Sequence, residues 1–313
     1  MARPDFLSPV HLYAPVDSFP AAGSEQSPNP QLLLNPNKSA MLIDQFRFSG
    51  QQAPLLHTDL WDFTYLGVDI RLGSIPLTNG IVPIPAIVPR YFGFPFATTA
   101  FDGTPTNDDA VMTWHLPRPL YVPPGVQLYV RFVRQDVFSV NNRDSAIENI
   151  GFSVVGRSMP TDYPIPKKIW VPWATATQCK QKATPFLRFV STDQELANPN
   201  TELLHVTSLN GFNTASQQGD QGLPVKSPLT AQMTLSSGKM LMRDPTNFFS
   251  LFPTDRGVLN LDAVLQSKEF VRCELELTQP DPAFGNTPND TIEYTTIGMI
   301  GYREVQTPIG VQP

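Results

Sequence analysis

Histidine is the residue type that most often carries acid–base or metal chemistry, and no histidine in this sequence has suitable neighbours. The histidines are His11, His57, His115 and His205. None has another His or a Cys at the spacing of a metal site, and no HExxH motif is present. His115 lies in the strand-like stretch Trp114-His115-Leu116-Pro117. We interpret all of them as structural residues rather than as catalytic bases or metal ligands.

Carboxylates gather weakly at two places, and oxygen ligands of this kind suit calcium. Asp59, Asp62 and Asp69 surround an aromatic stretch, and Asp108 and Asp109 are adjacent in a predicted loop. The EF-hand pattern is absent, so we interpret these residues as solvated turn carboxylates. A glycosidase would need two carboxyl groups at a defined separation, which a sequence does not define. We therefore assign no catalytic, cofactor-binding or metal-binding residue and expect no cofactor; a structural divalent ion is compatible with the loops but not indicated.

The two cysteines, Cys179 and Cys273, are too few for a zinc set or a disulfide framework. We expect two free thiols in a reducing cytoplasm, with a single bridge between them as the alternative. Motifs for nucleotide binding and for serine or redox catalysis (GxxxxGKS/T, GxGxxG, GxSxG and CxxC) are absent. We therefore expect that the chain is not an enzyme.

Aromatic residues form two runs that could line a sugar-binding face. The runs are Trp61, Phe63 and Tyr65, and then Tyr91, Phe92, Phe94 and Phe96. Such side chains more often fill a core or a subunit interface, because they bury large apolar areas. We favour the core or interface interpretation for both runs.

The composition limits the architecture that must position these residues. Prolines number 33 among 313 residues, which is about twice the usual share. Proline fixes φ and lacks a backbone donor, so it is excluded from helix interiors and central strands. The composition therefore favours short strands joined by extended connections over long helices.

Charge narrows the kinds of partner that we expect. Charged residues make up 16% of the chain, where about 25% is typical, and the net charge is −6. No Lys/Arg-rich run is present, whereas a protein that grips phosphate backbones needs clustered positive charge. We therefore expect no direct binding of nucleic acid. We also expect no signal peptide and no membrane span, because no apolar run of about 7–15 residues follows Met1 and no stretch comes near ~18 apolar residues.

Alternation of apolar and polar residues, the pattern of a strand with one buried face, recurs along the chain. Clear examples begin at Val68, Val126, Leu229 and Val271. Asn79-Gly80 predicts a type I′ hairpin turn, and Pro124-Gly125 predicts the centre of a type II turn. Short helices are expected at 246–251 and 261–266. Together these patterns predict an all-β sandwich or barrel.

Parts of the sequence recur at fixed offsets, which indicates an internal repeat. Asn35-Pro36-Asn37 precedes the apolar positions Met41, Ile43 and Phe46; 163 residues later, Asn198-Pro199-Asn200 precedes Leu204, Val206 and Leu209. At an offset of 145, Ile147-Glu148 and Gly156 match Ile292-Glu293 and Gly301, and the strand from Val126 matches that from Val271. We predict two copies of one sandwich, with a single irregular β domain as the alternative.

These marks define the domain organisation that we expect. The ranges are an extended N-terminal arm (1–30), a first jelly roll (31–157), a proline-rich linker (158–182), a second jelly roll (183–306) and a C-terminal tail (307–313). The linker holds Trp170 and Trp173 among its prolines, a composition typical of a semi-rigid connector pinned by indoles.

Tandem sandwiches, a proline-rich connector, an N-terminal arm and the hairpin sequence at 119–132 (PLYVPPGVQLYVRF) form a recognisable combination. The chain resembles the double jelly-roll major capsid proteins of icosahedral, membrane-containing tailless bacteriophages. The likeness covers about residues 30–306. It implies an all-β fold of two tandem eight-stranded antiparallel jelly-roll sandwiches, a double jelly roll, with few short helices.

The same resemblance implies a structural virion protein. Homotrimers would form pseudo-hexagonal blocks that tile an icosahedral shell, and the partners would be further copies of the chain and minor capsid or vertex proteins. The N-terminal arm would either lock neighbouring copies together or contact an inner membrane. The protein would be located in the virion capsid after synthesis in the host cytoplasm.

Two other functions stay open at this point. A carbohydrate-active or carbohydrate-binding β-sandwich protein would show an exposed aromatic platform or a carboxylate pair. Another virion component, such as a spike, would form a trimer without lattice-forming sides.

Overall fold

A computed structural model describes residues 9–15, 31–33, 39–52, 66–88, 110–134, 147–160, 163–182, 189–213, 229–242, 244–252, 258–277 and 292–308. The chain divides into two compact units. Unit 1 comprises Met1–Ile84, Pro95–Ala174 and Gly301–Pro313, and unit 2 comprises Pro85–Phe94 and Thr175–Ile300. Strands dominate the described residues, together with two short helices, α1 (Ile84–Ile87) and α2 (Phe248–Leu251).

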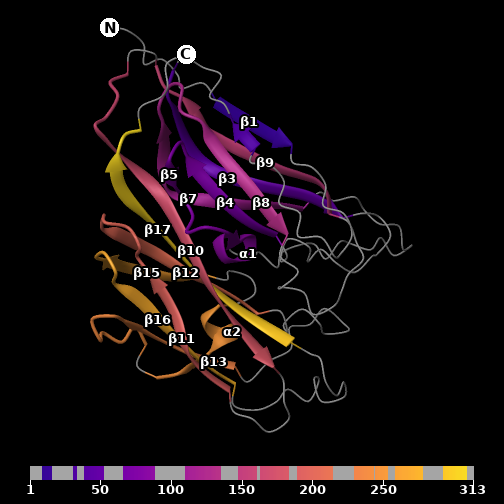
Figure 1. Cartoon of the computed structure of the whole chain (residues 1–313), viewed down its shortest axis with the longest axis vertical. Coiled ribbons are helices and arrows are strands. Elements are labelled where there is room, and N and C mark those ends of the chain that lie inside the picture. Colours follow the sequence, from indigo (N-terminus) through magenta and orange to yellow (C-terminus); the bar gives the residue numbers. More distant parts are fainter. Residues whose placement is uncertain are drawn as a thin grey trace. The chain divides into compact units, whose positions relative to one another are not determined.

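Unit 1 holds two antiparallel sheets (Figure 1). The first has the order β1-β9-β3-β7 and consists of β1 (Pro9–Pro15), β9 (Ile147–Ser158), β3 (Met41–Gln52) and β7 (Ala110–Val122). The second has the order β2-β8-β4-β5 and consists of β2 (Gln31–Leu33), β8 (Leu128–Arg134), β4 (Leu66–Leu72) and β5 (Ile75–Pro76), while β6 (Val82–Pro83) also pairs with β4.

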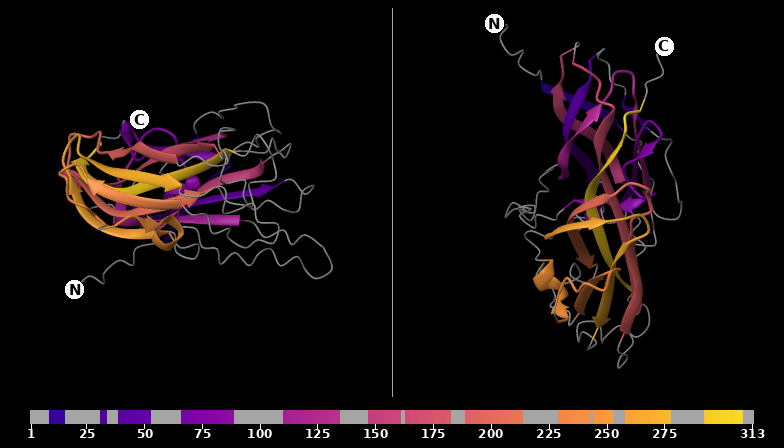
Figure 2. Two further views of the ribbon diagram at one scale, coloured as in Figure 1. Left: turned by 90° about the horizontal axis from the view of Figure 1, so that it is seen from below. Right: turned by 90° about the vertical axis from the view of Figure 1, so that its left-hand side faces the viewer.

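The second half of the chain forms two further sheets. One has the order β11-β16-β13-β14 and consists of β11 (Phe189–Ala197), β16 (Phe270–Leu277), β13 (Leu229–Leu235) and β14 (Thr246–Asn247). The other has the order β10-β17-β12-β15 and consists of β10 (Lys168–Lys182), β17 (Ile292–Gln306), β12 (Leu204–Asn213) and β15 (Val258–Leu265). The long strand β17, coloured yellow, runs beside β10 (Figure 2).

The two halves repeat one topology. Strands β1–β4 correspond in chain order to β10–β13, and β7–β9 correspond to β15–β17, so the order β1-β9-β3-β7 matches β10-β17-β12-β15 and the order β2-β8-β4-β5 matches β11-β16-β13-β14. β3 begins at Met41 and β12 at Leu204, an offset of 163; β9 begins at Ile147 and β17 at Ile292, an offset of 145. The predicted repeat is thus confirmed, and the fold is an all-β double jelly roll with few short helices.

A β-bulge occurs at the same place in both halves. The register of β3 against β7 shifts at Asp44, and that of β12 against β15 shifts at Thr207, which is 163 residues later. Gly156 on β9 lies against β3, where an added Cβ would be 2.0 Å from the carbonyl oxygen of Leu42. Such bulges bend a strand and increase its twist. A shared irregularity at the repeat offset supports duplication more strongly than a shared strand pattern does.

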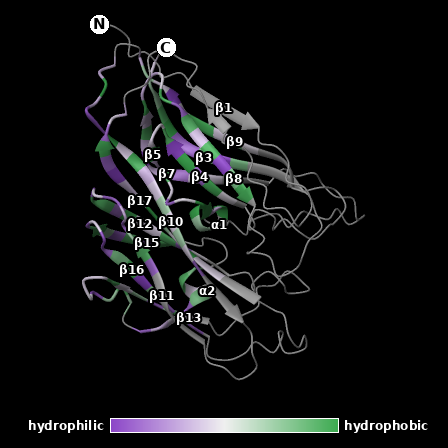
Figure 3. Ribbon diagram, in the orientation of Figure 1, coloured by the Kyte–Doolittle hydropathy of each residue, from purple (hydrophilic) through white to green (hydrophobic). Residues whose placement is uncertain are grey.

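Aromatic side chains fill the core of unit 1. Phe46 and Phe48 on β3 both contact Phe152 on β9, and Phe46 also meets Trp114 on β7. Phe48 contacts Phe132 on β8 with ring centroids 6.2 Å apart, so the two sheets of this unit pack face to face. All five side chains are buried, and each burial stabilises the fold by about 1.5–3 kcal/mol. The alternation of hydrophobic and hydrophilic residues along the strands is visible in Figure 3.

In unit 2, β16 shows the predicted alternation. Val271, Cys273 and Leu275 are fully buried, whereas Arg272 between them is exposed. Cys273 is a free thiol, and its burial raises the pKa of the thiol to about 12. The side chain of Cys179, the other cysteine, lies outside the described residues. Cys273 therefore behaves as a small hydrophobic core residue rather than as a nucleophile.

The two turn predictions had different outcomes. At Pro124-Gly125 the type II turn is confirmed: the Val126 N–H donates to the Pro123 carbonyl, and Gly125 has a φ of 73°. At Asn79-Gly80 the type I′ hairpin is wrong, because only Gly80 has a positive φ. β5 and β6 pair with β4 rather than with each other, and the Asn79 N–H donates instead to the Ala174 carbonyl. Tertiary contacts therefore shape this loop.

The helix predictions were half right, and part of the expected linker is a strand. Residues 246–251 form β14 and α2, but most of 261–266 belongs to β15, where pairing with β12 overrides the weak helical pattern. Residues 168–182 form β10. Residues 9–15 of the expected arm form β1 on the edge of the first sheet. The other predicted domain limits stay predictions.

Asn198 lies in the connection between β11 and β12 and bonds to the turn between β15 and β16. Its buried side-chain Nδ2 donates to the carbonyls of Glu202, Leu265 and Gln266, at 2.9, 3.1 and 3.2 Å. Its backbone carbonyl accepts from the Lys268 N–H at 2.9 Å, and its Oδ1 accepts from the Asn200 N–H at 3.1 Å. This satisfied buried amide gives Asn198 a structural role in its own half of the repeat; Asn35, the matching residue, lies outside the described residues.

We expect Asn198→Ala to destabilise the protein by roughly 2–4 kcal/mol, because it removes a buried amide that donates to three carbonyls, of which that of Leu265 is buried. Denaturant titration followed by tryptophan fluorescence measures this change. Asn200→Ala is the matched control, because the half-buried Asn200 bonds only to Asn198 there. Equal losses in the two variants would contradict the role assigned to Asn198.

Lys268 is in the left-handed region with a φ of 68°, which costs an L-residue about 1–2 kcal/mol. We expect Lys268→Gly to stabilise the protein by roughly 0.5–1 kcal/mol after the entropy cost of glycine in the unfolded chain. Thermal unfolding by calorimetry measures the change. Ser267→Gly, at the exposed neighbouring position, should give no gain because its φ is not positive. A lower melting temperature for Lys268→Gly would sink the prediction.

Cys273 should be unreactive in the native protein, because its buried thiol stays protonated far above the ordinary thiol pKa. In a Cys179→Ser background, a thiol-specific chromogenic disulfide at about pH 8 should modify Cys273 only after guanidinium unfolds the chain. Stoichiometric modification of the folded variant within minutes would contradict this burial.

Candidate functional site

The histidines do not come together in the described structure. His115 is exposed on β7, and His205 is half-buried on β12. His11 lies on β1 with its side chain outside the described residues, and His57 lies outside them altogether. Among the described residues, no group of three or more His, Cys, Asp or Glu side chains could hold a metal ion.

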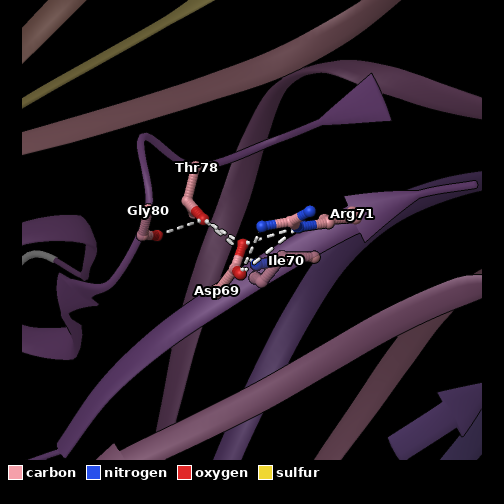
Figure 4. Close-up of polar contacts among 5 residues, drawn as sticks. All are labelled: Asp69, Ile70, Arg71, Thr78 and Gly80. Carbon is pink, nitrogen blue, oxygen red and sulfur yellow. Dashed lines mark hydrogen bonds and ion pairs between the residues drawn. The ribbon is translucent and has the colours of Figure 1, made fainter. Parts of the chain in front are cut away.

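Asp69 is the one carboxylate of the predicted clusters that the structure describes, and an arginine pairs with it (Figure 4). Arg71 Nη2 lies 3.0 Å from Asp69 Oδ2, and its Nε lies 3.3 and 3.2 Å from the two carboxylate oxygens. Hydrogen bonding to Asp69, and then the carboxylate charge, raise the pKa of the Arg71 guanidinium. Asp69 is therefore the buried half of an ion pair.

Thr78 extends this network into the loop before β6. The Ile70 N–H donates to Thr78 Oγ1 at 3.0 Å, and Thr78 Oγ1 donates to the Gly80 carbonyl at 2.9 Å (Figure 4). The Ala174 N–H on β10 donates to the Leu77 carbonyl at 3.0 Å. The buried network thus fixes a loop against β10 within unit 1, which is a structural role.

Most of the remaining candidates lie outside the described residues. These are Asp59, Asp62, Asp108 and Asp109, and the aromatic runs Trp61, Phe63, Tyr65, Tyr91, Phe92, Phe94 and Phe96. The core or interface interpretation of the aromatic runs therefore stays a prediction. No helix in the described part of the chain is long and apolar enough to cross a membrane.

The two tryptophans of the expected linker have different environments on β10. Trp173 is buried, and the Arg303 guanidinium from β17 lies 5.0 Å from its ring centroid. Arg303 is itself buried, and its Nη2 donates to the Pro76 carbonyl at 3.0 Å. A buried cation held by a carbonyl and an aromatic face is anchored rather than available for binding. Trp173 therefore belongs to the interior of unit 1.

Trp170 instead belongs to a surface cluster, which we call the Arg118 cluster: Arg118, Trp170 and Tyr302. The exposed Arg118 guanidinium lies 4.7 Å from the Trp170 ring centroid and 4.6 Å from that of Tyr302. The two half-buried rings meet edge-on with centroids 5.3 Å apart. Trp, Tyr and Arg are the residue types that most often dominate binding energy at protein interfaces. The cluster is therefore the strongest candidate interaction site among the described residues.

Sequence analysis missed this cluster, although one local signal was present. Arg118 stands between Pro117 and Pro119 in β7, and prolines within a strand indicate an edge or a bulge. That signal identifies an unusual edge, but it does not say which aromatic residues meet the arginine. The meeting depends on β7, β10 and β17 converging within unit 1.

The described residues also include exposed large apolar side chains outside the Arg118 cluster. Tyr163 and Ile165 lie in the proline-rich segment before β10, Leu203 lies just before β12, Met240 lies after β13, and Val264 lies on β15. Isolated exposed apolar residues are normal on protein surfaces.

No protein-family model matches the sequence, and no curated protein matches it. Among solved structures, the chain is similar to VP54 of PBCV-1, as fitted into a reconstruction of the virophage Sputnik, with 10% identity, a TM-score of 0.52, and coverage of 99% of this chain and 97% of that chain. It is also similar to a chain of the PBCV-1 virus capsid, with 11% identity, a TM-score of 0.51 and the same coverage.

A weaker likeness joins the chain to a peptide-N4-(N-acetyl-β-D-glucosaminyl) asparagine amidase, with 12% identity, a TM-score of 0.38, and coverage of 96% of this chain and 100% of that chain. A likeness at that TM-score carries no argument about activity. At such low identities the comparisons show the fold alone, and that fold is the double jelly roll of the viral capsid structures.

Proposed function

We propose that this chain is a viral major capsid protein, whose homotrimers form pseudo-hexagonal blocks that tile an icosahedral shell. The observation that carries the proposal is the repetition of one jelly-roll topology in both halves of the chain. The fold likeness to the PBCV-1 capsid chains over 99% of the sequence supports it.

The repeat explains how a trimer could fill a hexagonal position. Each chain carries two sandwiches of the same strand order, so three chains related by a three-fold axis would present six similar sandwiches. A heterologous contact that closes after three chains would use different surfaces of each protomer. Weak lateral contacts between such blocks would then add by multivalency in a closed shell.

The composition of the chain also suits assembly through side chains. Only 16% of residues are charged, and interface cores are depleted in charge. The edge strand β7 carries Pro117 and Pro119, which oppose open-ended pairing of strands between molecules. Prolines in the connections reduce the entropy lost when loops become ordered in contacts. The proposal assigns the chain no catalytic activity.

The finer form of the proposal concerns the virion. The net charge of −6 and the lack of a Lys/Arg-rich run are compatible with a genome behind a lipid layer, as in membrane-containing tailless bacteriophages. The parts of the N-terminal arm outside β1, which pairs with β9, would hold neighbouring copies or contact that membrane. Minor capsid or vertex proteins would complete the shell. The chain would be made in the host cytoplasm and then located in the virion.

Light scattering after size exclusion tests the assembly state directly. We expect a stable trimer near 104 kDa, which is three times 34.7 kDa, or larger shells. The measurement is made with and without added divalent ions. A strict monomer at high protein concentration would contradict the proposal, and glycan-array binding would then test the carbohydrate-binding alternative.

A further inference from the structure

The Arg118 cluster stands where the first jelly roll departs from the internal repeat. At the bulge of unit 1, Asp44 of β3 opposes residues 116–119 of β7 before pairing resumes. At the matching bulge of unit 2, Thr207 of β12 opposes only Leu261 and Asp262 of β15. The first bulge is therefore longer by two residues, and it contains Arg118. Bulges of this kind re-aim side chains.

The lengthened bulge is rigid and blocks strand pairing. Pro117 and Pro119 fix φ on both sides of Arg118 and remove two backbone donors. β7 is the edge of its sheet, so a neighbour could otherwise add a strand there. This part of the edge therefore presents the Arg118 side chain to a partner, instead of presenting a row of backbone hydrogen-bond groups.

The aromatic rings hold the guanidinium in place before any partner binds. Arg118 lies within 5 Å of both ring centroids, and its Nη2 donates weakly to Tyr302 Oη at 3.5 Å. Contacts with Trp and Tyr faces stabilise an arginine cation and reduce its rotamer freedom. Binding to a preordered side chain costs less conformational entropy.

Arg118 differs from comparable exposed cations because it forms no ion pair with a carboxylate in the described structure. Arg157 pairs with Asp44 at 3.5 Å, and Arg272 pairs with Glu195 at 2.9 Å. Glu304, which lies on the same strand as Tyr302, instead pairs with Lys168 at 3.2 Å. Within the described residues, the contacts of Arg118 are the two rings and the Tyr302 hydroxyl.

From these observations we infer that Arg118, held by Trp170 and Tyr302, binds a carboxylate of a second copy of this chain. The planar guanidinium fork matches a carboxylate in a two-bond geometry. The chain supplies such groups in excess, with 28 acidic against 22 basic Lys and Arg residues. The inference rests on the proposed capsid function and names one contact through which copies associate.

The test uses the full-length protein and measures the dissociation constant of the assembly by sedimentation equilibrium. Arg118→Ala should raise that constant about tenfold or more, because it removes an interface arginine and leaves a carboxylate unpaired. Arg118→Lys keeps the charge and the aliphatic stem but loses the fork, so its affinity should be intermediate. Arg157→Ala is the matched control, because Arg157 is similarly exposed but pairs within its own chain.

Two further measurements separate a binding role from a structural one. The melting temperature of the dilute, dissociated chain should be unchanged in Arg118→Lys. Raising NaCl from about 0.05 to about 0.5 M should weaken association of the natural chain more than that of Arg118→Ala. Salt screens the proposed ion pair of the natural chain, and the variant has no such pair to lose.

Each outcome decides the inference. If the natural chain assembles and Arg118→Ala and Arg118→Lys assemble equally well, the contact is wrong and the capsid proposal stands. A natural chain that stays monomeric overturns both. If inorganic phosphate or anionic lipid vesicles bind the dissociated chain through Arg118 while assembly is unaffected, the ligand is a phosphate and the inference falls.

Discussion

Burial of one aromatic face between two sheets is the interaction on which the structure of unit 1 depends. Phe46 and Phe48 on β3 pack against Phe152 within one sheet, and Phe48 reaches Phe132 in the other. Because side chains alternate across a strand, a register slip of one residue would turn both β3 rings to the outer face. The core therefore selects one register for β3, and the pairing of β9 and β7 with it follows.

Both halves of the chain have the same strand order, and the irregularities of the strands are informative. The bulges at Asp44 and Thr207 occupy equivalent positions, so the repeat extends from strand order to local distortion of the backbone. The two halves differ at the lengthened bulge of β7, and core packing does not account for this difference. The lengthened bulge around Arg118 adds nothing to the buried core, since Arg118 is exposed. Such a difference at an exposed sheet edge is expected where the protein binds a partner.

Two buried polar residues, one in each unit, connect separate segments of the chain. Asp69 is neutralised by Arg71, and Asn198 binds carbonyls on two connections. Networks of this kind are costly when they are incomplete, so they select a single arrangement of the loops. The shell function that we propose would need this property, because lateral contacts repeated many times require blocks of one shape. The double jelly roll, which the chain shares with the PBCV-1 capsid structures, is compatible with that need.

Local patterns in the sequence determined the strand class, the duplication and the turn at Pro124-Gly125. Alternation with a period of two and the positive φ open to glycine depend only on neighbouring residues. Strands and this turn can therefore be predicted without knowing the fold. The tertiary structure alone decided the loop at Asn79-Gly80, which bonds to Ala174, and the strand β10 in a segment that resembled a linker. It also decided the candidate site, because Arg118 meets Tyr302 across 184 residues of sequence. Contacts of that separation depend on which strands converge, and no local preference of the chain encodes that.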